Sequence, residues 1–152
     1  MPYTDAHDVL NILQINLLYE TILIMSNDAV QGTKVLIVDD SGYMRQVIRK
    51  YLEPKGFVII GEAQDGWEAI QLYDKLRPDV VTMDISMKKL GGIEATKKIK
   101  AIEPNVKIIM VSALGEARFI KEAIKAGAND FIIKPFAEER LVSSITNAVL
   151  KG

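Results

Sequence analysis

The stretch KVLIVDD, Lys34–Asp40, decides the fold of this chain. Its run of Val, Leu and Ile is typical of a strand buried on both faces of a parallel sheet, and two carboxylates follow it directly. The stretches VVTMD (Val80–Asp84) and FIIKP (Phe131–Pro135) have the same form, an apolar run followed by a charged residue. Because ligands bind beyond the carboxyl ends of parallel strands, the three stretches indicate one shared site.

Outward from these stretches, strand and helix patterns alternate along the rest of the chain, and Pro and Gly residues separate several of them. The expected strands are Val35–Val38, Val58–Ile60, Val80–Met83, Val106–Val111 and Phe131–Ile133, and the expected helices are Ser41–Leu52, Gly66–Leu76, Ile93–Ile102, Glu116–Ala126 and Ala137–Leu150. Five strands alternating with five helices predict a doubly wound α/β fold, in which helices cover both faces of one parallel sheet.

The first 33 residues lie outside this alternation. They contain four acidic residues and no Lys or Arg, whereas residues 34–152 contain 19 basic and 16 acidic residues. We therefore divide the chain into an N-terminal extension, residues 1–33, and one domain, residues 34–152. Within the extension, Val9–Met25 could form one helix. Three interpretations stay open: an upstream start codon or tag, a helix that packs on the domain or a partner, and, least favoured, membrane association.

Composition excludes several classes of protein. A net charge of +3 spread over the domain is not the charge pattern of a nucleic-acid-binding surface. Without cysteine the chain has neither a disulfide framework nor a thiolate zinc site. Polar residues interrupt Val9–Met25, which is shorter than the roughly 20 apolar residues of a membrane span, and no basic signal-peptide region precedes it. We expect a soluble cytoplasmic protein with no nucleic-acid partner and no membrane insertion.

The carboxylates at the strand ends suit a cation and a phosphoryl group. Asp39 and Asp40 repel each other, which raises a pKa or favours a bound cation, and Mg²⁺ is typically held by one or two carboxylates together with waters and phosphate oxygens. Alternatively, the pair stabilises the start of the following helix. Asp84 is separated from the next helix by Ser86–Gly92, which argues against a capping role. A carboxylate fixed beside magnesium can act as a nucleophile and form an acyl phosphate.

Two further strand ends carry groups that could contact a phosphate. Ser112 ends the fourth expected strand, where its hydroxyl could donate to a phosphoryl oxygen or stabilise a turn. Lys134, at the end of a buried strand, needs an anionic partner, and its compact charge suits phosphate. The Lys134–Pro135 bond is a candidate for a cis peptide that would aim the lysine inward.

In this order and spacing, the motifs VLIVDD, VVTMD, VSA and FIIKPF resemble the receiver domain of two-component response regulators, over about Lys34–Leu150. The stretches DVVTMDISMKKLGGIEA and VSALGEARFIKEAIKAGANDFIIKPF are similar to stand-alone chemotaxis regulators of the CheY type. The resemblance implies a flavodoxin-like (βα)5 sheet with strand order 2-1-3-4-5.

The resemblance also implies a role for each site residue. Asp84 would accept a phosphoryl group from the phosphohistidine of a histidine kinase, with Mg²⁺ as cofactor. The implied metal ligands are Asp39, Asp40, Asp84 and the backbone carbonyl of Ser86, the implied phosphate contacts are Lys134 and Ser112, and the implied switch residues are Ser112 and Phe131. For Phe131 a plain core role stays open. The last helix–strand–helix unit, from Glu116 to Leu150, would bind a downstream motor-switch or adaptor protein.

The loop after Asp84 departs from the family, because Lys88 and Lys89 stand where proline and an acidic residue are frequent. We expect a phosphoacceptor rather than an enzyme with a separate substrate. Three alternatives stay open. A phosphorelay shuttle would pass its phosphate on to a second histidine. A phosphatase with an aspartyl nucleophile would want an acid at the position of Ser86. A flavin-binding module would want a Ser/Thr/Gly-rich loop in place of Asp39 and Asp40.

Overall fold

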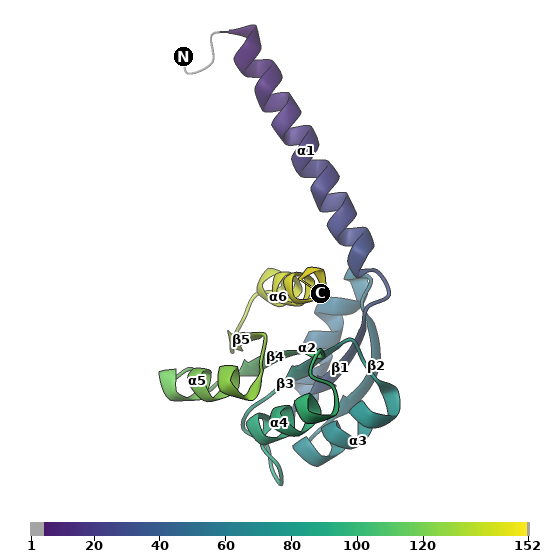
Figure 1. The fold of residues 1–152 in the computed structure, drawn as a ribbon, viewed down its shortest axis with the longest axis vertical. Coiled ribbons are helices and arrows are strands. Elements are labelled where there is room, and N and C mark those ends of the chain that lie inside the picture. The colour runs from purple at the N-terminus through teal and green to yellow at the C-terminus, as the bar shows by residue number, and fades with distance from the viewer. Residues whose placement is uncertain (1–4, 152) are drawn as a thin grey trace.

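The computed structural model describes residues 5–151, which contain one five-stranded parallel sheet in the order β2-β1-β3-β4-β5 (Figure 1). The strands are β1 (Lys34–Val38), β2 (Val58–Ala63), β3 (Val80–Met83), β4 (Lys107–Ser112) and β5 (Asp130–Ile133). The helices are α1 (Ala6–Val30), α2 (Gly42–Leu52), the 3-10 turn η1 (Glu53–Lys55), α3 (Gly66–Leu76), α4 (Gly92–Ile102), α5 (Ala117–Ala126) and α6 (Glu138–Leu150). The predicted doubly wound fold and its strand order are confirmed.

Alternation along β1 builds the two halves of the core. Leu36 and Val38 face the layer formed by α3, α4 and α5, whereas Val35 and Ile37 face the layer formed by α2 and α6. All four side chains are at most 1% exposed. A strand buried on both faces has no polar face, which is why its sequence is a continuous apolar run.

The direction of winding changes between β1 and β3. From β1 the chain runs outward to β2 and then returns to β3 on the other side of β1 (Figure 1). Such a change of direction leaves a crevice between the two central strands at their carboxyl ends. Asp39 and Asp40 follow β1 directly, and Asp84 follows β3, so the topology alone brings these three residues to the same crevice.

Helix α1 is longer than expected and projects away from the domain, with contacts to α6 near its C-terminal end (Figure 1). It spans 25 residues, and an 18-residue window in it has a mean hydropathy of 1.5 with none of that window buried, so by length and composition alone it could cross a membrane. From the sequence we expected Val9–Met25 to be too short to span a membrane. The helix is longer than that segment, because it continues beyond both of its ends. Only its last residue, Val30, joins the core.

Strand β2 also extends beyond its expected end at Ile60. Gly61, Glu62 and Ala63 continue the pairing with β1, after a register shift between Val35 and Leu36. Gly61 permits close packing of strand and helix, since a Cβ there would lie 2.9 Å from Cδ1 of Leu76 in α3. Because glycine and glutamate are depleted in strands, the local sequence predicts a strand that is too short. Pairing with β1 extends the strand through these residues.

The start of α4 lies directly against the backbone of Asp84. The amide of Gly92 donates to the carbonyl of Ile85 at 2.9 Å, and a Cβ at Gly92 would overlap the carbonyl oxygen of Asp84. A residue larger than glycine therefore has to displace the main chain that carries Asp84.

We predict that Gly92→Ala lowers the free energy of unfolding by about 1–3 kcal/mol, the usual cost of overpacking. Chemical denaturation of the two proteins measures the difference. Gly42→Ala is the matched control, because a Cβ there meets only the guanidinium of Arg45 at an ordinary 3.5 Å. Equal stability of Gly92→Ala and the parent protein would contradict the close approach described above.

We also predict that a chain starting at Met25 keeps the stability of the full chain to within about 0.5 kcal/mol, as expected when only exposed residues are changed. Apart from the partly buried Ile12, the large apolar side chains from Val9 to Ile24 that line α1 are between 43% and 73% exposed. Urea denaturation of both proteins is the measurement. A loss of several kcal/mol would mean that α1 covers the domain in solution.

Candidate functional site

Three carboxylates meet in the crevice between β1 and β3. Oxygen atoms of Asp39, Asp40 and Asp84 all lie within 4.8 Å of one another. Asp39 and Asp84 are buried, at 1% and 5% exposure, whereas Asp40 faces solvent. Two buried carboxylates so close together either raise a pKa or need a compensating cation, because water cannot fully solvate their charges.

Lys134 supplies part of that compensation. Its Nζ donates to Oδ2 of Asp39 at 2.6 Å and lies 3.7 Å from Oδ1 of Asp84. The side chain is 16% exposed, and the Lys134–Pro135 peptide is cis. Lys134 follows β5, so it reaches the crevice across β4 and β3. The structure thus brings the lysine and the carboxylates together, although their strands are far apart in the sequence.

Asp84 is the carboxylate whose protonation is most perturbed. Burial is the main cause, the charge of Asp39 adds to it and Lys134 partly opposes it, with the net result that the pKa of Asp84 rises from 3.8 to about 6. Perturbation by burial together with a specific charged partner is typical of functional carboxylates. Without a bound metal ion, the ionised form of Asp84 therefore lowers the stability of the fold at pH values above about 6.

The position of Asp39 is fixed from two sides. Its Oδ1 accepts from the amide of Ser41 at 2.9 Å, and Ser41 is itself the N-cap of α2. Its backbone carbonyl accepts from the guanidinium of Arg45 at 2.6 Å, and Arg45 is in turn held by Glu62 of β2 at 3.1 Å. Asp39 therefore supports the start of α2 as well as facing the crevice.

Arg45 and Glu62 were not among the residues expected at the site. Arg45 and Arg49 lie one helical turn apart on α2, and both contact Glu62. The i, i+4 spacing of the two arginines is the sequence signal that could have indicated a shared acidic partner. Nothing local identifies Glu62 as that partner, because it lies in the part of β2 that the sequence did not predict.

Ser112 and Lys134 are joined through the backbone. The amide of Lys134 donates to the carbonyl of Ser112 at 2.9 Å. Ser112 is fully buried, and its Oγ accepts from the amide of Leu114 at 3.1 Å. The hydroxyl hydrogen is not used in that bond, so the group can still donate to an anion.

Phe131 and Ser86 were also expected at this site. Phe131 is half-buried in β5 and packs against the core on the side of α3, α4 and α5. This placement is that of a partly exposed core aromatic. Ser86 lies in the loop that follows Asp84 and is exposed.

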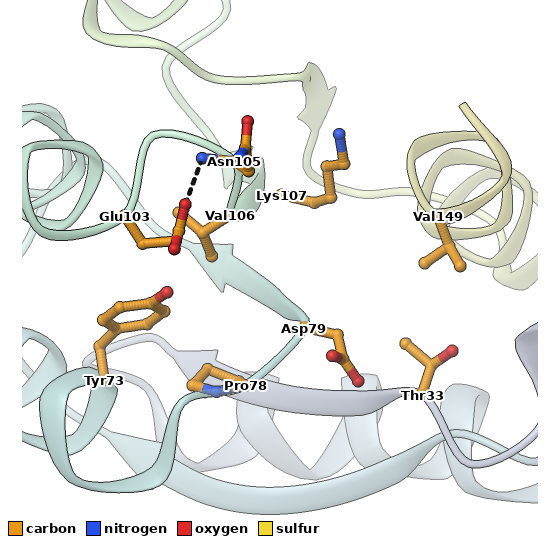
Figure 2. Close-up of a pocket in the computed structure, with 9 residues that line it drawn as sticks. All are labelled: Thr33, Tyr73, Pro78, Asp79, Glu103, Asn105, Val106, Lys107 and Val149. Atoms are coloured by element: carbon orange, nitrogen blue, oxygen red, sulfur yellow. Dashed lines mark hydrogen bonds between the residues drawn. The ribbon is translucent and has the colours of Figure 1, made fainter. Parts of the chain in front are cut away.

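A cavity at the opposite edge of the sheet does not belong to this site (Figure 2). It measures about 460 Å³ and lies where the strands begin, with Thr33 before β1, Asp79 before β3 and Lys107 at the start of β4 among its lining residues. The amide of Asn105 donates there to Glu103 at 2.9 Å. None of the four charged residues of the crevice lines this cavity.

The donor set of the crevice fits a small hard cation. Carboxylate oxygens are the ligands that Mg²⁺ prefers, and the ion binds them at about 2.1 Å in octahedral geometry. The three carboxylates, whose oxygens lie within 4.8 Å of one another, are close enough to contribute ligands to one such ion. Asp40 is exposed, which leaves one side open to water and to a ligand. Asp39, Asp40 and Asp84 are therefore the side chains that could hold such an ion.

The fold and the arrangement of this crevice define a class of signalling domain. The family model of the response regulator receiver domain matches residues 35–146, and the chain belongs to that family. Within it, the chain is CheY-like. The chemotaxis protein CheY of Thermotoga maritima is 48% identical over 114 residues, which cover 75% of this chain and 95% of that protein.

Further relatives support the same assignment. Protein CcdB of Bacillus subtilis is 46% identical over 117 residues, covering 77% of this chain and 98% of that protein. A chain of the CheX–CheY–BeF3–Mg²⁺ complex from Borrelia burgdorferi superposes with a TM-score of 0.75 at 34% identity, covering 79% of this chain and 91% of that chain. The resemblance noted in the sequence is thus confirmed.

We predict that Asp84→Asn stabilises the metal-free protein at pH 7.5 by about 1–3 kcal/mol and has no such effect at pH 4. Because folding raises the pKa of Asp84 from 3.8 to about 6, the folded state binds this proton more tightly than the unfolded state. The stability associated with it is present below pH 4 and is lost as the pH rises through 6.

Urea denaturation in a chelating buffer at both pH values measures this effect. Asp74→Asn is the control, because Asp74 is an exposed carboxylate paired with Arg77 at 2.7 Å on α3. A gain of equal size at both pH values would contradict the assigned pKa.

Proposed function

We propose that this protein is a single-domain response regulator that takes a phosphoryl group from the phosphohistidine of a histidine kinase onto Asp84. The observation that carries the proposal is the contact of one lysine with two buried carboxylates, Lys134 with Asp39 at 2.6 Å and with Asp84 at 3.7 Å. Such an arrangement leaves a nucleophilic oxygen beside a fixed positive charge and beside acidic ligands for a cation.

The transfer itself requires little covalent chemistry from the protein. An oxygen of ionised Asp84 attacks phosphorus while the bond from phosphorus to the imidazole nitrogen breaks. The electron pair of that bond stays on the imidazole nitrogen, and the ring becomes a neutral imidazole when it takes up a proton. Asp84 becomes an acyl phosphate. Positioning and charge neutralisation dominate such transfers, and in this site they are the roles of Asp39, Asp40 and Lys134.

We propose Mg²⁺ as the cofactor, held by Asp39, Asp40, Asp84 and the backbone carbonyl of Ser86. When bound, the ion would neutralise the carboxylates and bind phosphoryl oxygens. The chain's own part is to keep two of these carboxylates buried and oriented, and to leave Asp40 accessible to solvent.

The new phosphoryl group would alter the contacts of Lys134 and Ser112. Phosphorylation adds nearly two negative charges and strong acceptor oxygens, which compete with Asp39 for the ammonium and can accept from the Ser112 hydroxyl. Since the amide of Lys134 donates to the carbonyl of Ser112, both contacts act on the same pair of adjacent strand ends. Phe131, on β5 three residues before Lys134, is the side chain that we propose to follow this movement.

We propose that the output surface is formed by α5, β5 and α6. Gly115, in the loop between Ser112 and α5, lies against the side chain of Ile133 in β5. Ile133 and Ile124 of α5 are 49% and 60% exposed. A pull on Ser112 therefore acts on a surface that already presents apolar side chains, the kind of surface that binds a protein partner. Similarity to CheY favours a motor-switch or adaptor protein of chemotaxis as this partner.

The proposal places the domain in the cytoplasm, where histidine kinases present their phosphohistidine. It also describes a phosphoacceptor rather than an enzyme that acts on a separate substrate. The position two residues beyond Asp84 is occupied by Ser86, which has no carboxyl group to serve as a general acid for turnover.

We predict that acetyl phosphate phosphorylates the protein only when Mg²⁺ is present, because unneutralised carboxylates repel the donor. Intact-protein mass spectrometry detects the gain of one phosphoryl group and its loss over time. Asp84→Asn should abolish the gain, and Asp74→Asn should retain it, since Asp74 is an exposed residue of α3. Phosphorylation of Asp84→Asn at the parent rate, or none of the parent protein in any condition, would overturn the proposed function.

A further inference from the structure

A second charged feature adjoins the acidic crevice. A cavity of about 320 Å³ is lined by Asp40, Gln64, Asp65, Lys88 and Lys89. Asp40 belongs both to this cavity and to the carboxylate cluster. The two lysines are the residues that depart from the family pattern in the loop after Asp84, and their ammonium groups stand beside a site whose own side chains are mainly acidic.

The loop that carries the lysines is held at both of its ends. The amide of Gly92 donates to the carbonyl of Ile85 at 2.9 Å, and the amide of Gly66, in the first turn of α3, donates to the carbonyl of Leu90 at 2.9 Å. These bonds fix the main chain on either side of Lys88 and Lys89. The lysines are therefore presented from a constrained loop rather than from a free one.

Lys89 adopts a backbone conformation that a lysine does not favour. Its φ is +67°, in the left-handed region that costs most residues about 1 kcal/mol. In this conformation its Nζ lies 3.6 Å from Oδ2 of Asp65, the N-cap of α3, whose other oxygen accepts from Glu68. Its side chain is nevertheless 73% exposed, so this weak pairing leaves the ammonium available to another anion.

Lys88 is exposed and forms no ion pair within residues 5–151. Its charge is therefore not used to hold the fold. Lysine is a compact, strongly hydrated charge on a flexible stem, which suits a transient contact with phosphate. A donor phosphate has to approach three carboxylates, and nearby positive charges raise the local concentration of an anion and its rate of arrival.

We propose that Lys88 and Lys89 form a capture site for the phosphoryl dianion of the donor at the entrance to the acidic crevice. The inference rests on the proposed function, since it concerns the donor of the same transfer. In that transfer the phosphoryl group moves to Asp84 and the bond to its leaving group breaks, with the electron pair staying on the leaving group. The lysines take no part in the bond changes, and they determine how fast the donor reaches Asp84.

The test is the initial rate of phosphorylation by acetyl phosphate, below saturation and with saturating Mg²⁺. The variant is Lys88→Gln/Lys89→Asn, because asparagine tolerates the left-handed backbone at this position. We expect the rate to fall at least about threefold at low ionic strength, and the difference to shrink as salt screens the lysines. Lys88→Arg/Lys89→Arg, which keeps both charges, should retain the parent rate.

Lys50→Gln/Lys151→Gln is the control for net charge, because it removes the same number of positive charges from exposed positions in α2 and after α6. It should leave the rate unchanged. The affinity for Mg²⁺ gives a second readout: in the Lys88→Gln/Lys89→Asn variant it should stay equal or become stronger, since two cations beside the metal site have been removed. A damaged site would instead bind Mg²⁺ more weakly.

A second donor, a peptide carrying one phosphohistidine, distinguishes the source of the phosphoryl group. A salt-sensitive loss with acetyl phosphate alone assigns the capture site to small acyl phosphates, and a loss with the peptide alone assigns it to phosphohistidine. Equal rates of variant and parent with both donors, or a loss independent of salt, would overturn the inference and leave the proposed function intact. Absence of phosphorylation in the parent protein would overturn both.

Discussion

The ion pair between Lys134 and Asp39 is the interaction on which the site depends. It joins residues 95 positions apart in the chain at 2.6 Å, from the ends of two strands that do not pair with each other. Asp39 is almost fully buried, and a buried carboxylate without a partner costs several kcal/mol. Lys134 therefore makes it feasible to hold Asp39 and Asp84 side by side in a folded protein. The same lysine is the cation that a phosphoryl group on Asp84 would compete for, so one contact links stability to signalling.

The fold was predictable from the sequence because local pattern and global topology agree along most of the chain. Runs such as Val35–Val38 are apolar because they are buried on both faces, and the helix Gly66–Leu76 begins after Asp65, which caps it. The prediction was wrong where tertiary packing overrides local preference. Strand β2 continues through Gly61 and Glu62 because it pairs with β1 there, and neither residue favours a strand on its own. The extent of α1 was also underestimated, since polar residues interrupt its apolar sequence.

The charged residues of the site were predictable because strand ends in a parallel sheet meet at one edge, so position in the sequence fixes position in space. The residues that hold these charged side chains in place were not predictable. Arg45, in the second turn of α2, donates to the backbone carbonyl of Asp39. Every residue has such a carbonyl, so the sequence does not indicate which one accepts the bond. The arrangement of Lys89 was equally unpredictable, because lysine rarely adopts the left-handed backbone that is observed there.

The constrained loop at Lys88 and Lys89 has a consequence for the duration of a signal. In the proposed function, an acyl phosphate on Asp84 would be lost by reaction with water, which has no net charge and is therefore not steered over long distances by an ammonium group. Under this proposal, charges at this entrance would act mainly on the arrival of an anionic donor and little on the approach of water. In a receiver built this way, sensitivity to the incoming stimulus and persistence of the response are set by different residues, and each can change during evolution without altering the other.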